Sequence, residues 1–120
     1  MKLPGPDHPI TVTPETRRVR VLVVGVAVAD TRRALRLEEA RYAPVFYVPR
    51  EDIQAEAFVA SVRTSHCPYK GDANYFDLVF GDTRRPGAVW SYEAPYPAVA
   101  AIREHVAFYP DRVDAIAVGD

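Results

Sequence analysis

A mainly β domain is the fold class that this sequence of 120 residues predicts, and three observations lead to it. Short runs of β-branched and aromatic residues recur along the chain. Several runs alternate apolar and polar side chains, which is the period of a strand with one buried face. Turn-forming residues, including eleven prolines and six glycines, separate the runs. About eight strands of this kind would form antiparallel sheets that curl into a barrel or a barrel-like sandwich.

The chain is expected to begin with a proline-rich arm. Residues 1–16 contain four prolines and little periodicity, so we expect an extended arm on the surface or a disordered tail. The remaining residues, 17–120, are enough for a single domain with its own core. Two valine-rich strands are predicted at 19–24 and 26–29, with a bulge or tight bend at Gly25 between them.

The middle of the chain contains shorter and less certain elements. Residues 34–38 alternate like a half-buried strand, although a helix over 31–42 is the alternative. A short apolar strand is predicted at 45–48, because prolines enclose it on both sides. A turn at 49–52 follows, and residues 53–60 fit either a short strand or one helical turn.

The second half is expected to contain a loop, a hairpin, one helix and a last strand. Pro68 and Gly71 predict a loop. The alternating, aromatic residues 75–80 and 88–92 predict two paired strands joined by a connection at 81–87. Pro97 suits the first position of a helix, and Val99, Ile102 and Val106 follow at helical spacing. The last strand is predicted at 113–118.

Composition narrows the function classes. A net charge of −1 provides no global basic field, so we expect no nucleic acid as partner and no anionic membrane surface. No apolar run is long enough for a membrane span, and residues 1–6 lack the apolar region of a secretory signal. A single cysteine cannot form an internal disulfide, which suits a reducing compartment. We therefore expect a cytoplasmic protein.

Unusual residue types gather in one segment. The only cysteine, the only asparagine and the only internal lysine are Cys67, Asn74 and Lys70. Thirteen of the fifteen basic residues are arginine, and the other lysine is Lys2. A lysine in such a chain indicates a position that needs a compact ammonium instead of a planar guanidinium. These observations predict a functional site around residues 66–74.

Cys67 and Lys70 are the candidate catalytic residues. A cation beside a thiol favours the thiolate, so Lys70 or His66 could activate Cys67 as a nucleophile. A free cysteine can equally be a contact in a binding pocket, or a small buried hydrophobe. The sequence leaves these three roles open.

Aromatic and polar residues around this segment suggest a binding pocket. The aromatic residues of the neighbouring predicted strands and loop would either line a ligand cage or fill a core, and they are Tyr47, Tyr69, Tyr75, Trp90 and Tyr92. Further candidates for ligand binding are polar or charged: Ser91, Arg50, Arg33 and Glu39. Arg50 and Lys70 would face an anionic or carbonyl group. Glu39 would orient Arg33 or Lys70, whereas the adjacent acids Glu38-Glu39 and Glu51-Asp52 would point to opposite faces and form no acid–base dyad.

No metal site and no cofactor are predicted. One cysteine and three scattered histidines (His8, His66 and His105) show no paired-ligand spacing. Lys70-Gly71 lacks the preceding glycines of a P-loop, and no G-x-G-x-x-G occurs.

Five sequence blocks resemble a known family. They lie in order over about residues 17–118: Arg33-Ala34-Leu35, Tyr47-Val48-Pro49-Arg50-Glu51-Asp52, Thr64-Ser65-His66-Cys67-Pro68-Tyr69-Lys70-Gly71 with Tyr75, Ala88-Val89-Trp90-Ser91-Tyr92, and Ala107-Phe108-Tyr109 through Val113. This pattern resembles the family numbered 427 among domains of unknown function. The resemblance implies a small, mostly bacterial, β-rich domain of the β-tent type, in which two sheets meet over a ligand pocket. Zinc-binding β-tent relatives use two Cys-x-x-Cys knuckles, which this chain lacks.

The same family often carries the label nucleotidyltransferase-like. Polymerase-type nucleotidyltransferases hold two metal ions with Gly-Ser and Asp-x-Asp motifs. Neither motif occurs in this sequence. The label therefore suggests a nucleotide-like ligand, although the chain lacks the metal-binding motif of these enzymes.

Three hypotheses for the function remain. The first is a domain that binds an unknown small molecule, anionic or nucleotide-like, in a pocket built by the candidate residues. The second is an enzyme that uses Cys67 for group transfer or hydrolysis. The third is a protein-interaction module, in which sheet edges and the proline-rich arm dock a partner or form a homodimer.

Overall fold

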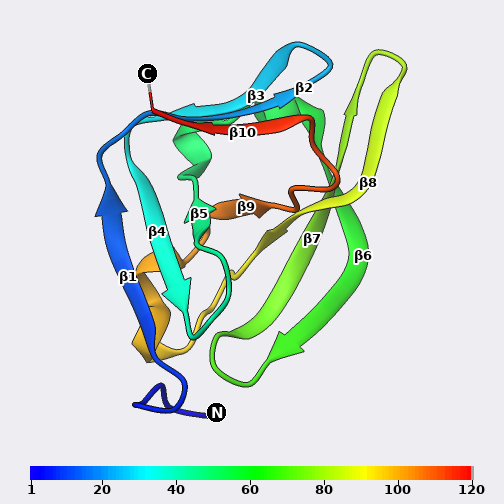
Figure 1. The fold of residues 1–120 in the computed structure, drawn as a ribbon. Helices are drawn as coiled ribbons and strands as arrows, with labels where there is room; N and C mark the ends of the chain where they lie inside the picture. The colour runs from blue at the N-terminus through cyan, green and yellow to red at the C-terminus, as the bar shows by residue number, and fades with distance from the viewer. Residues whose placement is uncertain (120) are drawn as a thin grey trace.

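The computed structural model describes residues 1–119, and short antiparallel strands make up most of it (Figure 1). The mainly β fold class is confirmed. The strands are β1 (Ile10–Glu15), β2 (Val19–Val23), β3 (Val26–Thr31), β4 (Ala34–Glu39), β5 (Val45–Tyr47), β6 (Phe58–Cys67), β7 (Gly71–Phe80), β8 (Thr83–Ser91), β9 (Val106–Phe108) and β10 (Ala115–Val118). Three short 3-10 helices join them: η1 (Arg50–Asp52), η2 (Ala55–Ala57) and η3 (Pro97–Ile102).

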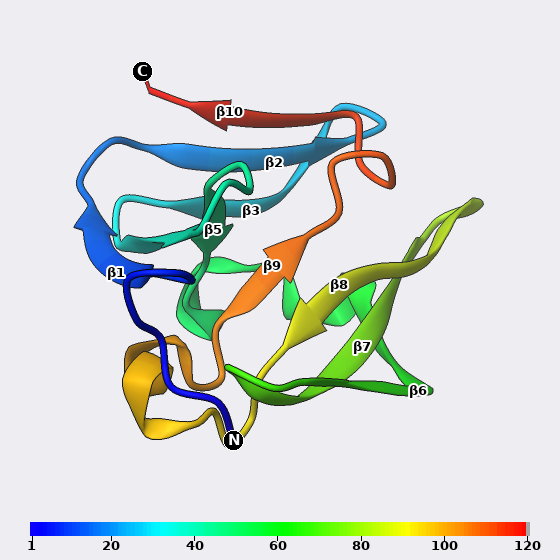
Figure 2. The same cartoon turned by 60° about the horizontal axis from the view of Figure 1, so that its bottom comes forward.

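The strands form three antiparallel sheets, and these do not close into a barrel within residues 1–119. Their strand orders are β1-β4-β5, β10-β2-β3 and β6-β7-β8-β9. Figure 2 shows the β10-β2-β3 sheet lying across one end of the molecule, with the four-stranded sheet running at an angle beneath it. Backbone hydrogen bonds between Val48 and Val106 connect the end of β5 to the start of β9.

Two apolar clusters hold the sheets together. The first lies between β2, β3 and the four-stranded sheet, and it includes Val21, Leu78 and Val89 at 0–1% exposure. The second lies between β4, β5, η3 and the other end of the four-stranded sheet, and it includes Leu37 and Tyr47. Lys70 and Glu39 lie beside residues of the second cluster, and the candidate site is built there.

Several element predictions differ from the structure. The helix expected from Pro97 is η3, a pair of short 3-10 turns with non-helical backbone at Val99. The helix alternative over 31–42 is wrong, because this segment contains β4. The bend expected at Gly25 is a hairpin turn in which Val24 (φ 48°) and Gly25 (φ 73°) both adopt positive φ. Paired positive φ values suit the right-handed twist of the flanking strands.

The N-terminal segment is partly ordered by pairing. Residues 10–15 form β1, which pairs with β4 from Ile10 opposite Glu39 to Glu15 opposite Ala34. The amide of Lys2 donates to the carbonyl of Pro68 at 2.7 Å, which ties the start of the chain to the β6–β7 turn. The division into a 1–16 arm and a 17–120 domain stays a prediction.

The segment expected to be a loop is largely a hairpin. β6 continues to Cys67, and Cys67 pairs with Gly71 across a turn of Pro68, Tyr69 and Lys70. Gly71 has φ +109°, which a side chain would strain. The amide of Tyr96 donates to the carbonyl of Lys70 at 3.0 Å, and this bond fixes the turn against the segment before η3. The turn therefore holds Lys70 at a defined place.

Candidate functional site

A buried ion pair between Glu39 and Lys70 forms the base of the candidate site. The Lys70 Nζ donates to Glu39 Oε1 at 2.6 Å, and the two side chains are only 11% and 14% exposed. The other carboxylate oxygen of Glu39 lies 2.7 Å from His8 Nε2. His8 stacks on Tyr69, with ring centres 4.0 Å apart and planes 7° apart. The N-terminal segment and the β6–β7 turn thus hold the carboxylate from two sides.

A cavity of about 410 Å³ lies against this ion pair, and we call it the Lys70 cavity. Aromatic side chains make up most of its wall. Its lining residues are Leu37, Glu39, Tyr42, Val45, Tyr47, Lys70, Tyr75, Trp90, Tyr92 and Tyr109. Flat walls with a few polar groups are typical of small-molecule sites.

Hydrogen bonds connect four aromatic side chains of the wall. Trp90 Nε1 donates to Tyr47 Oη at 3.2 Å. The hydroxyl of Tyr75 lies 2.8 Å from Ser65 Oγ and 3.3 Å from Tyr109 Oη. Trp90 also packs on Tyr109, with ring centres 4.5 Å apart. These contacts connect the four rings to one another and to Ser65 of β6.

The surroundings shift several pKa values. Burial acts to raise the pKa of Glu39, but the hydrogen bonds from Lys70 and His8 outweigh it, so that the pKa lies below its usual value. Burial raises the pKa of Tyr47 and of Tyr92 far above the ordinary tyrosine value. Burial and the bond to Tyr75 raise the pKa of Tyr109 to about 12. At neutral pH the cavity therefore presents neutral hydroxyls beside an ionised carboxylate.

Five of the predicted site residues come together in this cavity. Glu39, Tyr47, Lys70, Tyr75 and Trp90 all line it, although β4, β5, β7, β8 and the β6–β7 turn contribute them separately.

Cys67 packs against the second apolar cluster, the one that includes Leu37 and Tyr47, and is partly buried. The two groups expected to activate it have other partners, since Lys70 binds Glu39 and His66 Nδ1 lies 2.7 Å from Asp72 Oδ1. His66 and Cys67 are neighbours in β6, so their side chains point to opposite faces. A reactive Cys67 stays a prediction.

Four other predicted residues lie outside the Lys70 cavity. Arg50 donates to Ser91 Oγ at 3.0 Å and to Glu93 Oε1 at 2.8 Å, and Ser91 follows Trp90 on the opposite face of β8. Arg33 pairs with Asp52 at 3.2 Å and is oriented by it, not by Glu39. Tyr69 stacks on His8 behind the ion pair. Arg33 and Arg50 do share a separate surface cavity of about 300 Å³.

Sequence reasoning missed His8 and Tyr109 as parts of the site. Tyr109 directly follows β9, and the pairing of β9 with β8 places Tyr109 against Trp90. The neighbouring aromatic residue Phe108 was the only local indication that this segment contributes to the site. His8 lies in the segment predicted to be an arm. Its partner Glu39 is 31 residues away, so no local pattern indicates their contact.

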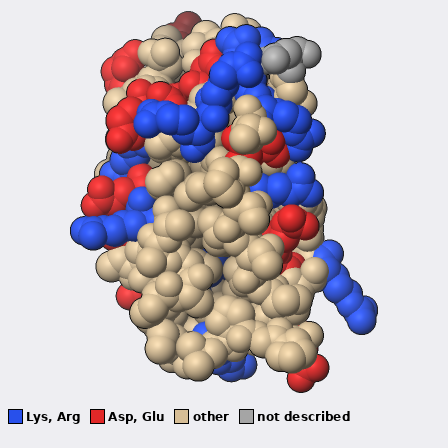
Figure 3. Space-filling view, turned by 90° about the vertical axis from the view of Figure 1, so that its left-hand side faces the viewer, with Lys and Arg blue, Asp and Glu red and all other residues tan. Residues whose placement is uncertain are grey.

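Within residues 1–119, no three His, Cys, Asp or Glu side chains are grouped as a metal site. No helix in the described part of the chain has the length and apolar character to cross a membrane. Figure 3 shows charges of both signs interspersed at the β2–β10 end of one face, whereas the rest of that face is largely uncharged.

Two comparisons with known proteins bear on the identity of the chain. A family model described as Domain of unknown function (DUF427) matches residues 11–119, which is nearly the whole sequence. No curated protein matches the chain.

Proposed function

The chain belongs to the family described as Domain of unknown function (DUF427), and on that premise we propose that it is a small-molecule-binding domain whose ligand occupies the Lys70 cavity. The observation that carries this proposal is the buried Glu39–Lys70 pair facing a cavity with aromatic walls. Burying two charges is expensive, and hydrophobic residues of similar size would stabilise a core equally well. A buried ion pair at the base of an open cavity is therefore better explained by binding than by folding.

Unused hydrogen-bonding groups support the same proposal. The Lys70 ammonium has three donors, and within residues 1–119 the contact with Glu39 uses one of them. Tyr92 is a buried residue that lines the cavity, and its hydroxyl makes no hydrogen bond to the described residues. The remaining donors of Lys70 and the hydroxyl of Tyr92 are therefore available to a ligand in the cavity.

The chemistry of the cavity indicates the type of ligand. A flat unsaturated group would pack against Trp90 and the tyrosine rings. A carbonyl or anionic oxygen would accept from Lys70, and Tyr92 would bind a second polar atom. Glu39 already neutralises Lys70, so shape and hydrogen bonding contribute more to recognition than net charge does. A nucleotide meets these requirements, and either its base or its phosphate would face Lys70.

Trp90 allows a direct test, because it is the only tryptophan of the chain and lines the cavity. We would titrate adenosine and AMP against the protein and follow the fluorescence of Trp90. We expect saturable changes, with binding about 10- to 100-fold weaker in Lys70→Met, since a hydrogen bond to a charged group contributes roughly 1.5–3 kcal/mol. Lys2→Met is the matched control, because Lys2 is exposed and does not line the cavity.

The two probes separate the possible contacts. Equal affinity for adenosine and AMP would place the ring at Lys70, whereas tighter binding of AMP would place the phosphate there. A nucleotide-like ligand is refuted if neither probe gives a saturable change, or if Lys2→Met weakens binding as much as Lys70→Met does.

A further inference from the structure

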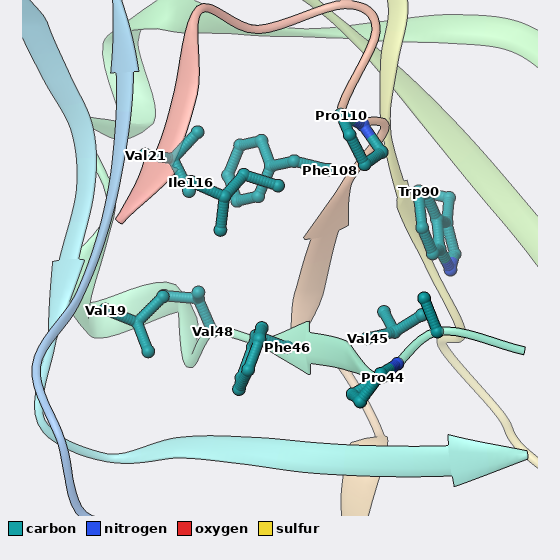
Figure 4. A pocket seen from close by; sticks show the side chains of 11 residues that line it. Val19, Val21, Pro44, Val45, Phe46, Val48, Trp90, Phe108, Pro110 and Ile116 are labelled. Carbon is teal, nitrogen blue, oxygen red and sulfur yellow. The ribbon is translucent and has the colours of Figure 1, made fainter. Parts of the chain in front are cut away.

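A second cavity, of about 230 Å³, lies beside the Lys70 cavity, and we call it the apolar cavity. Val45 and Trp90 line both cavities, so these two side chains form the wall between them. Figure 4 shows the side chains of β2, β5, β9 and β10 surrounding an open space, with Trp90 at one side. Apart from Trp90, which lies between the two spaces, no side chain proposed to contact the ligand of the Lys70 cavity lines this second space.

The apolar cavity has a buried floor and an open mouth. Val19, Val21, Val48 and Phe108 form the floor and are at most 4% exposed. The exposed residues of the lining are Ala43, Pro44 and Pro110, which lie at the mouth. A ligand can thus enter from solvent without opening the core.

The lining provides almost nothing for water to bind. The lining side chains contain one polar atom, the indole nitrogen of Trp90. This nitrogen already donates to Tyr47, which lines the other cavity. A water molecule needs two to four polar partners, and apolar cavities in proteins stay dry. Protein interiors also contain few voids larger than one water molecule. An apolar space of this size offers water few partners, so it suits an apolar occupant.

We propose that the apolar cavity is a binding site for a hydrocarbon group of benzene size or somewhat larger. An engineered cavity of about 150 Å³ lined by apolar side chains is large enough to bind benzene. The apolar cavity exceeds that volume, and its walls include the faces or edges of Phe46, Trp90 and Phe108. Aromatic rings prefer edge-to-face and offset contacts, which these walls allow. This site goes beyond the proposed function, because the evidence for it is independent of Lys70.

The experiment uses benzene as the probe and the methyl NMR signals of valine and isoleucine as the readout. We expect saturable shifts of the Val21, Val48 and Ile116 methyl signals in the wild-type chain. Ile116→Phe, in an edge strand, extends a side chain into the cavity and is expected to weaken benzene binding at least tenfold. Ile10→Phe is the matched control, since Ile10 is partly buried too but lines neither cavity, and it should leave binding unchanged.

Two further variants make the outcome unambiguous. Ala43→Phe at the exposed mouth would obstruct entry without a change in the core, so it covers the case in which Ile116→Phe does not fold. Lys70→Met should bind benzene as well as the wild type does, which separates this proposal from that for the Lys70 cavity. Absence of saturable shifts in the wild-type chain would overturn the proposal. So would undiminished binding in folded Ile116→Phe and Ala43→Phe, or shifts confined to other parts of the protein.

Discussion

Replacement of Lys70 by methionine provides the sharpest test of the ion pair, because it keeps most of the apolar stem and removes the ammonium with its charge and its hydrogen-bond donors. The Lys70 and Glu39 side chains are 11% and 14% exposed, so the pair is largely shielded from water. Removal of one partner of a buried pair costs about 3–5 kcal/mol of unfolding free energy. Glu39 keeps His8 as a partner, so we expect the lower end, about 3 kcal/mol. Glu39→Gln leaves Lys70 with no anion among the described residues, and we expect it to lower the unfolding free energy by about 4 kcal/mol.

The assay is urea unfolding of both single variants and the double variant. An m-value of about 1–3 kcal/mol/M converts a loss of 3 kcal/mol into a midpoint shift of about 1–3 M. The double variant contains no unpaired charge, so its loss should be close to that of one single variant and well below the sum, about 7 kcal/mol. Additive losses, or losses below about 1 kcal/mol for each single variant, would show that the two side chains do not form a buried pair in solution.

Three further predictions concern acid stability, the turn and the core. The pKa of Glu39 is lowered in the folded state, so its contribution to stability is complete above about pH 4.5 and is lost as the pH falls further; urea unfolding of Glu39→Gln should show a flatter profile below that pH. Gly71→Ala should destabilise the chain by about 1–2 kcal/mol, because φ is +109°, whereas Gly5→Ala, in open space without positive φ, should change it by less than about 0.5 kcal/mol in the same assay. In thermal unfolding, Leu78→Ala should cost about 3 kcal/mol because Leu78 is fully buried, and an equal effect of Val62→Ala, at an exposed position, would contradict the assigned core.

Local periodicity predicted most of the sheet but not its connections. The strand predictions at 19–24, 45–48 and 75–80 agree with β2, β5 and β7, because each run alternates or is strongly β-branched. The hairpin around Lys70 was predicted as a loop, since Pro68 and Gly71 indicate a turn without indicating its length. The pairing of Cys67 with Gly71 depends on the register between β6 and β7. Such register is set by packing of the whole sheet, which no local pattern reveals.

The candidate site shows the same division between local and non-local information. Residue usage alone indicated Lys70, and the predicted strands indicated Tyr47, Tyr75 and Trp90. Strand alternation would have separated Trp90 from Ser91, because neighbours in a strand face opposite sides. Arg50 was associated with Lys70 through its nearness to Tyr47 in sequence. The chain turns at η1 after Tyr47, and this turn directs Arg50 toward Ser91 and Glu93 instead.

The geometry also gives a physical reason for a lysine at position 70 in a chain that otherwise uses arginine. A guanidinium has five N–H donors in a fixed plane, and each needs an acceptor when it is buried. Glu39 is the only anion that Lys70 contacts among the described residues, and His8 already occupies its second oxygen. An arginine would leave several buried donors unsatisfied and would extend into the Lys70 cavity. A compact ammonium needs fewer acceptors and binds Glu39 with one donor.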